Sequence, residues 1–224
     1  MSNAAELLDR LGRPGAVRLG APTLVPGRLS TGLPALDGAL AGGLPRGRVT
    51  ELIGARSAGR TALACRIAAS ATTAAETIAW IDPGDTLDPA AADGAGVALS
   101  RTLWVRPRSP GDALRATEIL LGAGGFGLVV LDPDAQLAPL GRTGSWIRLA
   151  RAAERTGSTL LVVTTTPQVG SCAALGLEIL GHQAHWSQGP GQLALLDGIS
   201  SSIAVARSRS GGMGRALVLR HAGA

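Results

Sequence analysis

One stretch of the chain has residue types and spacing that suit the binding of a phosphate. It fits the pattern G-x-x-x-x-G-K-[ST] from Gly54 to Thr61 at every position but one, because Arg60 stands where the lysine is expected. Glycines let backbone N–H groups wrap around a phosphate, and a following helix adds the positive end of its dipole. The candidate phosphate ligands are Gly54, Ser57, Ala58, Gly59, Arg60 and Thr61.

A second polar position fits the same chemistry. Asp132 ends the apolar run GLVVLD, where a carboxylate could hold Mg²⁺ through water beside the hydroxyl of Thr61. The alternative is an aspartate that only caps the turn before Pro133. The first interpretation predicts a metal site made by Thr61 and Asp132.

These side chains need a framework, and the hydrophobic pattern predicts one. Apolar runs at 48–54, 77–82, 103–106, 127–132 and 158–165 alternate with helical stretches at 60–74, 110–122 and 144–155. Strands that alternate with helices favour an α/β fold, with a mostly parallel central sheet flanked by helices. We expect Gly54, Asp82 and Asp132 at the carboxyl ends of its strands, where such sheets bind ligands.

The same pattern predicts which helical residues face the sheet and how the chain ends. The expected inward residues are Leu114, Ile119 and Leu120 on one helix, and Ile147, Leu149 and Ala153 on another. The spacing also makes Trp146 a core residue rather than a base-stacking one. Beyond Thr166, apolar segments at 175–179, 202–206 and 216–219 lack long helices between them and predict antiparallel strands that extend the sheet.

The N-terminal stretch has a different character. Residues 3–12 predict a short amphipathic helix with an apolar stripe of Leu7, Leu8 and Leu11, and a Pro- and Gly-rich connector follows. The predicted domains are 1–28, a helix and connector, and 29–224, the core. The helix could pack on its own domain, or it could contact another subunit or protein.

The composition limits the possible partners of the protein and its expected location in the cell. The 224 residues carry a formal charge of +5, and all 21 basic residues of the Lys and Arg class are arginine, which permits a nucleic-acid partner without requiring one. Genomic bias towards arginine and loss of function are both open explanations for Arg60. The two cysteines make no disulfide framework, and Cys65 is expected to be a small core residue. No signal peptide or membrane span is evident, so we expect a cytoplasmic protein.

The order of motifs resembles the ATPase core of RecA recombinases. The similar motifs are STGLPALD, GGLPRGRVTELIG, the phosphate loop, WIDPGDTLDP and LVVLD. The resemblance places Gly84 where RecA has the glutamate that activates water, with Asp85 next to it. Arg60 replaces the loop lysine, and Thr165-Thr166 replaces an Asn-Gln pair that senses the γ-phosphate. Losing a catalytic base alone removes roughly 10²–10⁴ in rate, so we expect little or no hydrolysis and no catalytic residue.

The resemblance also bears on DNA and on neighbouring subunits. The two loops that bind DNA in RecA are shortened here to about 140–145 and 167–172, which implies weak or indirect DNA binding, although Arg142 and Arg148 could meet phosphates. Arg207 and Arg209 stand where RecA has two lysines that reach the neighbour's nucleotide. The alternative is a pair of exposed arginines on an edge strand.

Among RecA-like proteins, the chain resembles the ImuA family of translesion synthesis accessory proteins. This resemblance implies a scaffold in SOS-induced mutagenesis, with weak affinity for ATP and Mg²⁺ at most. The implied partners are an ImuB-like protein related to the Y family, an error-prone DnaE-type polymerase and RecA, with self-association also open. Two other readings remain: an active RecA paralogue that binds DNA and hydrolyses ATP, and a division inhibitor of the SulA type.

Overall fold

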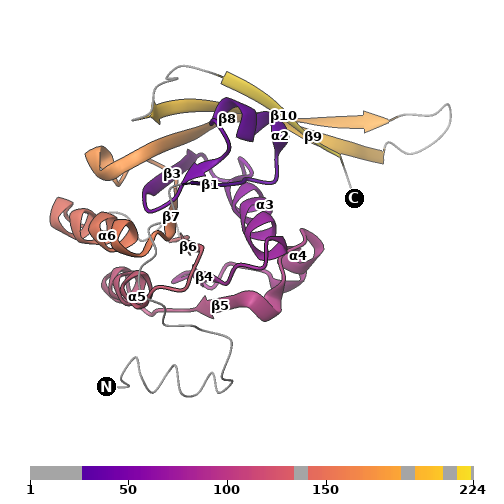
Figure 1. Ribbon diagram of the computed structural model, residues 1–224. Coiled ribbons are helices and arrows are strands. Elements are labelled where there is room, and N and C mark those ends of the chain that lie inside the picture. The colour runs from indigo at the N-terminus through magenta and orange to yellow at the C-terminus, as the bar shows by residue number, and fades with distance from the viewer. Residues whose placement is uncertain (1–26, 134–140, 188–194, 209–215, 223–224) are drawn as a thin grey trace.

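A computed structural model describes residues 27–133, 141–187, 195–208 and 216–222. Within these residues the chain forms an eight-stranded sheet of order β10-β9-β8-β3-β7-β6-β4-β5, together with a small two-stranded sheet. Figure 1 shows α3 and α4 on one side of the large sheet and α5 and α6 on the other. Each side has its own hydrophobic core. The predicted α/β fold, a mostly parallel sheet flanked by helices, is confirmed.

The parallel part of the sheet holds the strands that the apolar runs predicted. They are β3 (Val49–Gly54), β4 (Ile78–Ile81), β5 (Thr102–Val105), β6 (Leu128–Leu131) and β7 (Thr159–Thr164). β3, β4, β6 and β7 are buried throughout because helices cover both faces, which explains their unbroken apolar sequences. β3 lies between β7 and β8, in the interior of the sheet.

Three long helices cover this sheet within the described ranges. They are α3 (Arg60–Thr73), α5 (Pro110–Ala123) and α6 (Thr143–Thr156). Ser109 caps α5 by accepting a hydrogen bond from the backbone N–H of Asp112 at 3.1 Å, and Gly157 ends α6 with φ of 74°. Short helical pieces α4 (Pro89–Gly94) and η1 (Leu99–Arg101) join β4 to β5. The sequence pattern did not predict them.

Two predicted inward residues lie outside. Ile119 is 45% exposed and Ile147 is 40% exposed. The buried positions of α5 and α6 include small or polar-tipped side chains instead: Ala113, Thr117, Ala152 and Ala153. Small residues let a helix approach the sheet closely, so side-chain size misled the prediction for the isoleucines. Trp146 is buried, as expected.

The motif STGLPALD and the glycines after it form a short helix and part of a two-stranded sheet, which share a hydrophobic core with α3. Thr31 donates its backbone N–H and its hydroxyl to Asp37, at 2.8 and 2.7 Å, across the start of helix α2 (Pro34–Ala39). β1 (Arg28–Leu29) pairs with β2 (Leu44–Pro45) in a small antiparallel sheet. A side chain at Gly43, which has φ of 117°, would collide with the Leu29 carbonyl. A Cβ atom built on Gly32 would lie 3.1 Å from Cβ of Ser70 on α3, so this motif packs against the helix that follows the phosphate loop.

The C-terminal strands differ from the prediction in direction and length. They are β8 (Ala173–Ser187), β9 (Leu195–Ser208) and β10 (Ala216–Ala222). β9 and β10 are antiparallel as predicted, but β8 pairs in parallel with β3. The prediction failed because the crossover from β7 to β8 uses only residues 165–172 and the short 3₁₀ helix η3 (Gly170–Cys172), where a parallel crossover usually contains a helix.

Two observations complete the outline. No helix among the described residues is long and apolar enough to cross a membrane. The predicted helix at 3–12, with Leu7, Leu8 and Leu11, and most of the connector lie outside the described residues.

Candidate functional site

The predicted phosphate loop joins β3 to α3 at the carboxyl end of the sheet. Its backbone takes up left-handed conformations at Ser57, with φ of 59°, and at Gly59, with φ of 91°. Gly59 is also the N-cap of α3, and the Ala58 N–H donates to the Ala55 carbonyl at 3.2 Å. Successive turns of this kind direct N–H groups into a concavity that suits an anion, next to the positive end of a helix dipole. The loop therefore has the backbone form that phosphate binding requires.

Arg60 packs against the first glycine of the loop. A Cβ atom built on Gly54 would lie 3.2 Å from Cγ and 3.4 Å from Cδ of Arg60, so the stem of the arginine packs on the glycine. Burial lowers the pKa of the Arg60 guanidinium, and the nearby Asp132 carboxylate opposes that shift. The opposite charges of Asp132 and Arg60 attract each other, and a forked hydrogen bond between the two side chains is a prediction.

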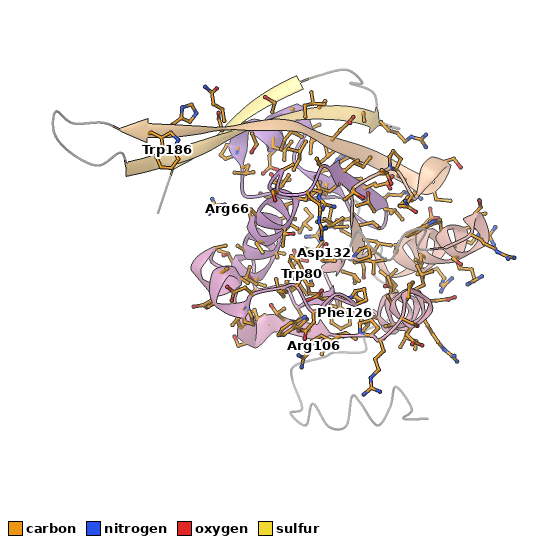
Figure 2. All side chains as sticks on the ribbon, turned by 180° about the vertical axis from the view of Figure 1, so that it is seen from behind. Arg66, Trp80, Arg106, Phe126, Asp132 and Trp186 are labelled. Atoms are coloured by element: carbon orange, nitrogen blue, oxygen red, sulfur yellow. The ribbon has the colours of Figure 1, made fainter. Side chains whose placement is uncertain are left out.

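Thr61, at the start of α3, and Asp132, directly after β6, lie close together at the carboxyl ends of the strands. The Thr61 hydroxyl lies 3.5 Å from Oδ2 of Asp132, which follows β6 and is 8% exposed. Figure 2 shows Asp132 in the interior of the molecule. A hydroxyl and a carboxylate at this separation fit the oxygen ligands of Mg²⁺, either directly or through water. Thr61 and Asp132 would hold such an ion, and its positive charge would neutralise the negative charge of a bound phosphate.

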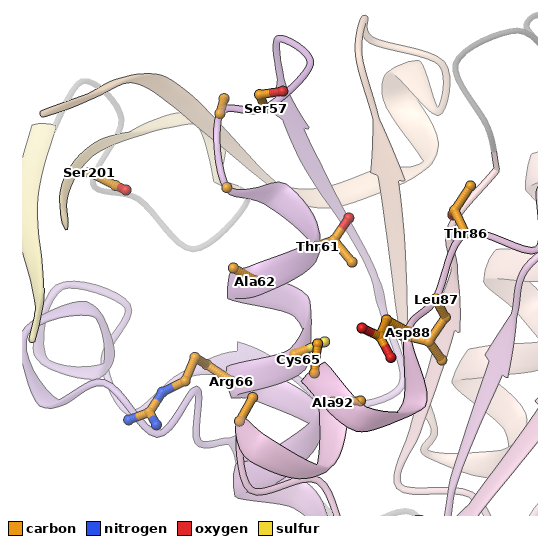
Figure 3. Close-up of a pocket in the computed structure, with 14 residues that line it drawn as sticks. Ser57, Thr61, Ala62, Cys65, Arg66, Thr86, Leu87, Asp88, Ala92 and Ser201 are labelled. Atoms are coloured by element: carbon orange, nitrogen blue, oxygen red, sulfur yellow. The ribbon is translucent and has the colours of Figure 1, made fainter. Parts of the chain in front are cut away.

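A pocket of about 510 Å³ extends from the loop along the outer side of α3 to α4. Figure 3 shows Ser57, Thr61 and Cys65 on one wall and Thr86, Leu87 and Asp88 on the other. This volume lies within the range of small-molecule sites, and a ligand phosphate at Gly59 would place the rest of that ligand here. Asp88 caps α4 through Ala90 N–H at 2.9 Å. The geometry suits a phosphorylated small molecule such as a nucleotide.

Cys65 forms part of the wall beside Asp132. Burial raises the pKa of its thiol to about 11, and the negative charge of Asp132 adds to the shift. The protonated thiol is a weak nucleophile at neutral pH, so Cys65 contributes packing, as the sequence predicted.

The first two acids after β4, Asp82 and Asp85, make their contacts away from the phosphate loop. Asp82 is fully buried and accepts hydrogen bonds from the N–H groups of Thr86 and Leu87, at 3.1 and 2.9 Å, and from Trp104 Nε1 at 3.3 Å. Asp85, with φ of 52°, pairs with Arg106 at 3.3 Å. Both side chains of that pair are more than half exposed, and neither residue lines the pocket.

The segment after β7 is held by a buried acid that the sequence analysis missed. Oε1 of Glu51, on β3, accepts hydrogen bonds from the N–H groups of Gln168 and Val169 at 2.5 and 3.0 Å. The Thr164 hydroxyl adds a longer contact of 3.4 Å. The available signal was one glutamate inside an otherwise uncharged buried strand, since such a charge needs partners. Thr166, one of the two threonines at the sensor position, accepts from Nε2 of Gln168 at 3.1 Å.

The remaining predicted residues are scattered or lie outside the described part. Arg207 is exposed on β9 and donates to the Gly170 carbonyl at 2.7 Å. Arg142 and Arg148 are exposed at the start of α6, on the opposite side of the sheet from α3. Arg209, Leu7, Leu8 and Leu11 are not among the described residues. The structure thus brings the loop and Asp132 together, and leaves the trans-subunit role of Arg207 and Arg209 a prediction.

Comparison with known proteins identifies relatives. A family model of the RecA N-terminal domain matches residues 3–145. Protein RecA of Streptomyces venezuelae is 36% identical over 137 residues, which cover 60% of this chain and 36% of that protein. Protein RecA of Deinococcus radiodurans is 40% identical over 137 residues, covering 60% and 38%. Protein RecA of Rubrobacter xylanophilus is 42% identical over 112 residues, covering 50% and 33%.

The chain spans little more than a third of the length of these curated relatives. The family model, by contrast, matches well over half of the chain, across the phosphate loop and Asp132. The chain therefore belongs to the RecA N-terminal domain family.

Proposed function

We propose that this protein is a RecA-like accessory scaffold, similar to ImuA, whose phosphate loop binds ATP and Mg²⁺ weakly and hydrolyses little or no ATP. Its role would be to assemble an error-prone translesion synthesis complex during the SOS response. The proposal combines an intact backbone cradle with side chains that do not supply the chemistry of hydrolysis.

One observation carries the proposal: the two acids nearest the expected position of the base, Asp82 and Asp85, make their contacts elsewhere. Asp85 pairs with Arg106 outside the pocket, and the buried Asp82 accepts hydrogen bonds from Thr86, Leu87 and Trp104. Asp88, which lines the pocket, caps α4. A general base must reach the attacking water directly or through one further water. Gly84 has no side chain to do so. The guanidinium of Arg60, which is wider than the ammonium expected at this position, is a second expected obstacle.

An active RecA paralogue that binds DNA is the second candidate. It is favoured by the approach of Thr61 to Asp132, at 3.5 Å, which keeps the pair of oxygens that Mg²⁺ needs. The printed names of the curated relatives also fit this reading. The two candidates differ in turnover.

A steady-state ATPase assay with single-stranded DNA distinguishes the candidates. We expect wild type to turn over at background and Asp132→Ala to be no slower, because no base activates water. The matched control is Asp112→Ala, which removes an exposed acid on α5. Turnover in the range typical of enzymes, roughly 1 s⁻¹ or more, that is lost in Asp132→Ala but kept in Asp112→Ala would establish the active ATPase instead.

The partners belong to the proposal as well. An ImuB-like protein, a DnaE-type polymerase and RecA are the candidates, and self-association is a further one. A pull-down with the tagged full-length chain from DNA-damaged cells of the source organism would test them. Recovery of the polymerase and the ImuB-like protein is expected, and recovery of division proteins alone would support the SulA-type reading.

A further inference from the structure

Helix α6 presents an unusual outer face. Its inner face buries Trp146 and Leu149 against the sheet. Its outer face carries three exposed arginines at helical spacing, together with Ile147, which is 40% exposed: Arg148, Arg151 and Arg155. An exposed isoleucine among arginines is not needed for the core, since α6 already buries a full apolar stripe. This face therefore combines positive charge with an apolar contact.

A groove runs beside this face. It has a volume of about 260 Å³ and lies between α6 and the segment that leads from η3 into β8. Its apolar lining comes from the start of β3, from α6, from the end of η3 and from the start of β8: Val49, Ile147, Ala150, Cys172 and Ala174. The volume is below the usual range for a small-molecule site, which suits a single anchoring side chain better than a whole ligand.

Arginines surround the groove. Arg48 and Arg151 line it, and Glu154 pairs with Arg48 at 2.6 Å. Arg207 reaches the neighbouring η3 turn, where it donates to the Gly170 carbonyl at 2.7 Å. Two arginines and one glutamate therefore line the groove, so its rim carries a net positive charge around an apolar floor. Complementarity to this charge calls for an acidic occupant, because opposite potentials steer association and exclude wrong partners.

We propose that the groove between α6 and η3 is a docking site for an acidic segment of a partner protein, which inserts one large apolar side chain between Ile147 and Cys172. Acids on either side of that anchor meet Arg48, Arg151 and the outer arginines of α6. A central apolar anchor with a polar rim is the usual arrangement of such sites. The site lies on the opposite face of the sheet from α3, so the proposal does not depend on nucleotide binding.

A nucleic acid is the less suitable occupant of this surface. Binding of single strands combines positive charge with aromatic side chains that stack on bases. No aromatic residue lines the groove, and the exposed Trp186 stands at the far end of β8. A protein segment with acids and one apolar anchor fits both the floor and the rim.

The test is selection from a phage-displayed library of random peptides on the full chain, followed by fluorescence anisotropy of the best peptide. The binding variants are Arg151→Glu, which reverses a rim charge, and Ala150→Trp, which fills the floor. Arg66→Glu is the matched control, because Arg66 is exposed on α3 and the charge change is identical. Glu154→Gln removes the one opposing acid, and thermal melting of each variant shows whether it is folded.

We expect selected peptides that carry acids around a single large apolar residue. Arg151→Glu and Ala150→Trp should each weaken their binding at least about tenfold, which corresponds to about 1.4 kcal/mol, with Arg66→Glu within twofold of wild type and Glu154→Gln tighter. Peptides without acids, or equal losses in Arg66→Glu, would overturn the proposal. So would displacement of the peptide by a single-stranded oligonucleotide that itself loses affinity in Arg151→Glu but not in Arg66→Glu, since the surface would then be assigned to nucleic acid.

Discussion

At the scale of single residues, Arg60 decides what the phosphate loop can hold. A guanidinium is planar and wider than the ammonium it replaces. Its stem lies on Gly54, and burial lowers the pKa of its guanidinium while the charge of Asp132 opposes that shift. The backbone of the loop has left-handed conformations at Ser57 and Gly59. We therefore expect a loop that can still receive a phosphate, in which the Arg60 guanidinium competes with that phosphate for space.

Exchanging this residue should restore space. We predict that Arg60→Lys binds ATP in the presence of Mg²⁺ about tenfold more tightly than wild type in isothermal calorimetry, because a slimmer cation leaves the concavity open. Arg66→Lys, at the pocket rim, is the control and should change little. An unchanged affinity in Arg60→Lys would mean that Arg60 is not what limits binding, and tight binding by wild type would mean that the loop is not degenerate.

Glu51 is the other residue with a measurable role. Oε1 of its buried carboxylate accepts hydrogen bonds from two backbone N–H groups of the segment after β7, and glutamine would keep an oxygen there but lose the negative charge that strengthens both bonds. We predict that Glu51→Gln lowers the free energy of unfolding by about 2 kcal/mol, measured by urea denaturation. Glu154→Gln, which breaks an exposed pair, should cost less than about 1 kcal/mol. Equal losses in the two variants would contradict a special role for Glu51.

At the scale of elements, the sequence predicted the parallel core well because its strands and helices differ in period and length. It failed where a decision depends on partners distant in the chain. β8 is parallel to β3 because of a short crossover that leaves no helical pattern, and α4 is too brief to show a period. Ile119 and Ile147 are exposed because the buried positions of α5 and α6 combine leucines and a tryptophan with small residues, so that side-chain size alone does not identify the inner face.

For the residues of the site, too, prediction succeeded where the signal is local in the sequence and failed where it depends on distant partners. The loop, Thr61 and Asp132 could be predicted, because a local pattern and a strand end define them. Glu51, the commitment of Asp85 to Arg106, and the wall formed by α4 could not, because each depends on contacts between segments far apart in sequence. Local motifs are visible in a sequence, whereas the partners of a buried charge are visible only in the fold.

The N-terminal segment is the element with the clearest remaining test. We predict that deleting residues 1–20 leaves the melting temperature unchanged, because the described strands and helices begin at Arg28. Association with itself, with RecA or with an ImuB-like partner should be lost, because an apolar stripe on a Pro-rich arm suits docking into a groove. Unchanged association with a lowered melting temperature would show that Leu7, Leu8 and Leu11 belong to the protein's own core.

At the scale of the whole molecule, one sheet separates two surfaces of different chemistry. The side of α3 holds the phosphate loop and its pocket, and the side of α6 holds the arginine-rimmed groove. Changes at sites this well separated usually act independently. A protein arranged in this way can contact a nucleotide on one face and a protein partner on the other.

The central place of β3 also governs how the molecule is made. The ribosome delivers β3 early, yet its neighbours are β7, where Val49 pairs with Leu160, and β8, where Ile53 pairs with Glu178. Pairings that span so much of the chain are slow to close, and a strand that waits for them exposes apolar surface meanwhile. We therefore expect the phosphate loop to fold only after most of the polypeptide has left the ribosome. Until then, the exposed apolar strand is expected to bind chaperones.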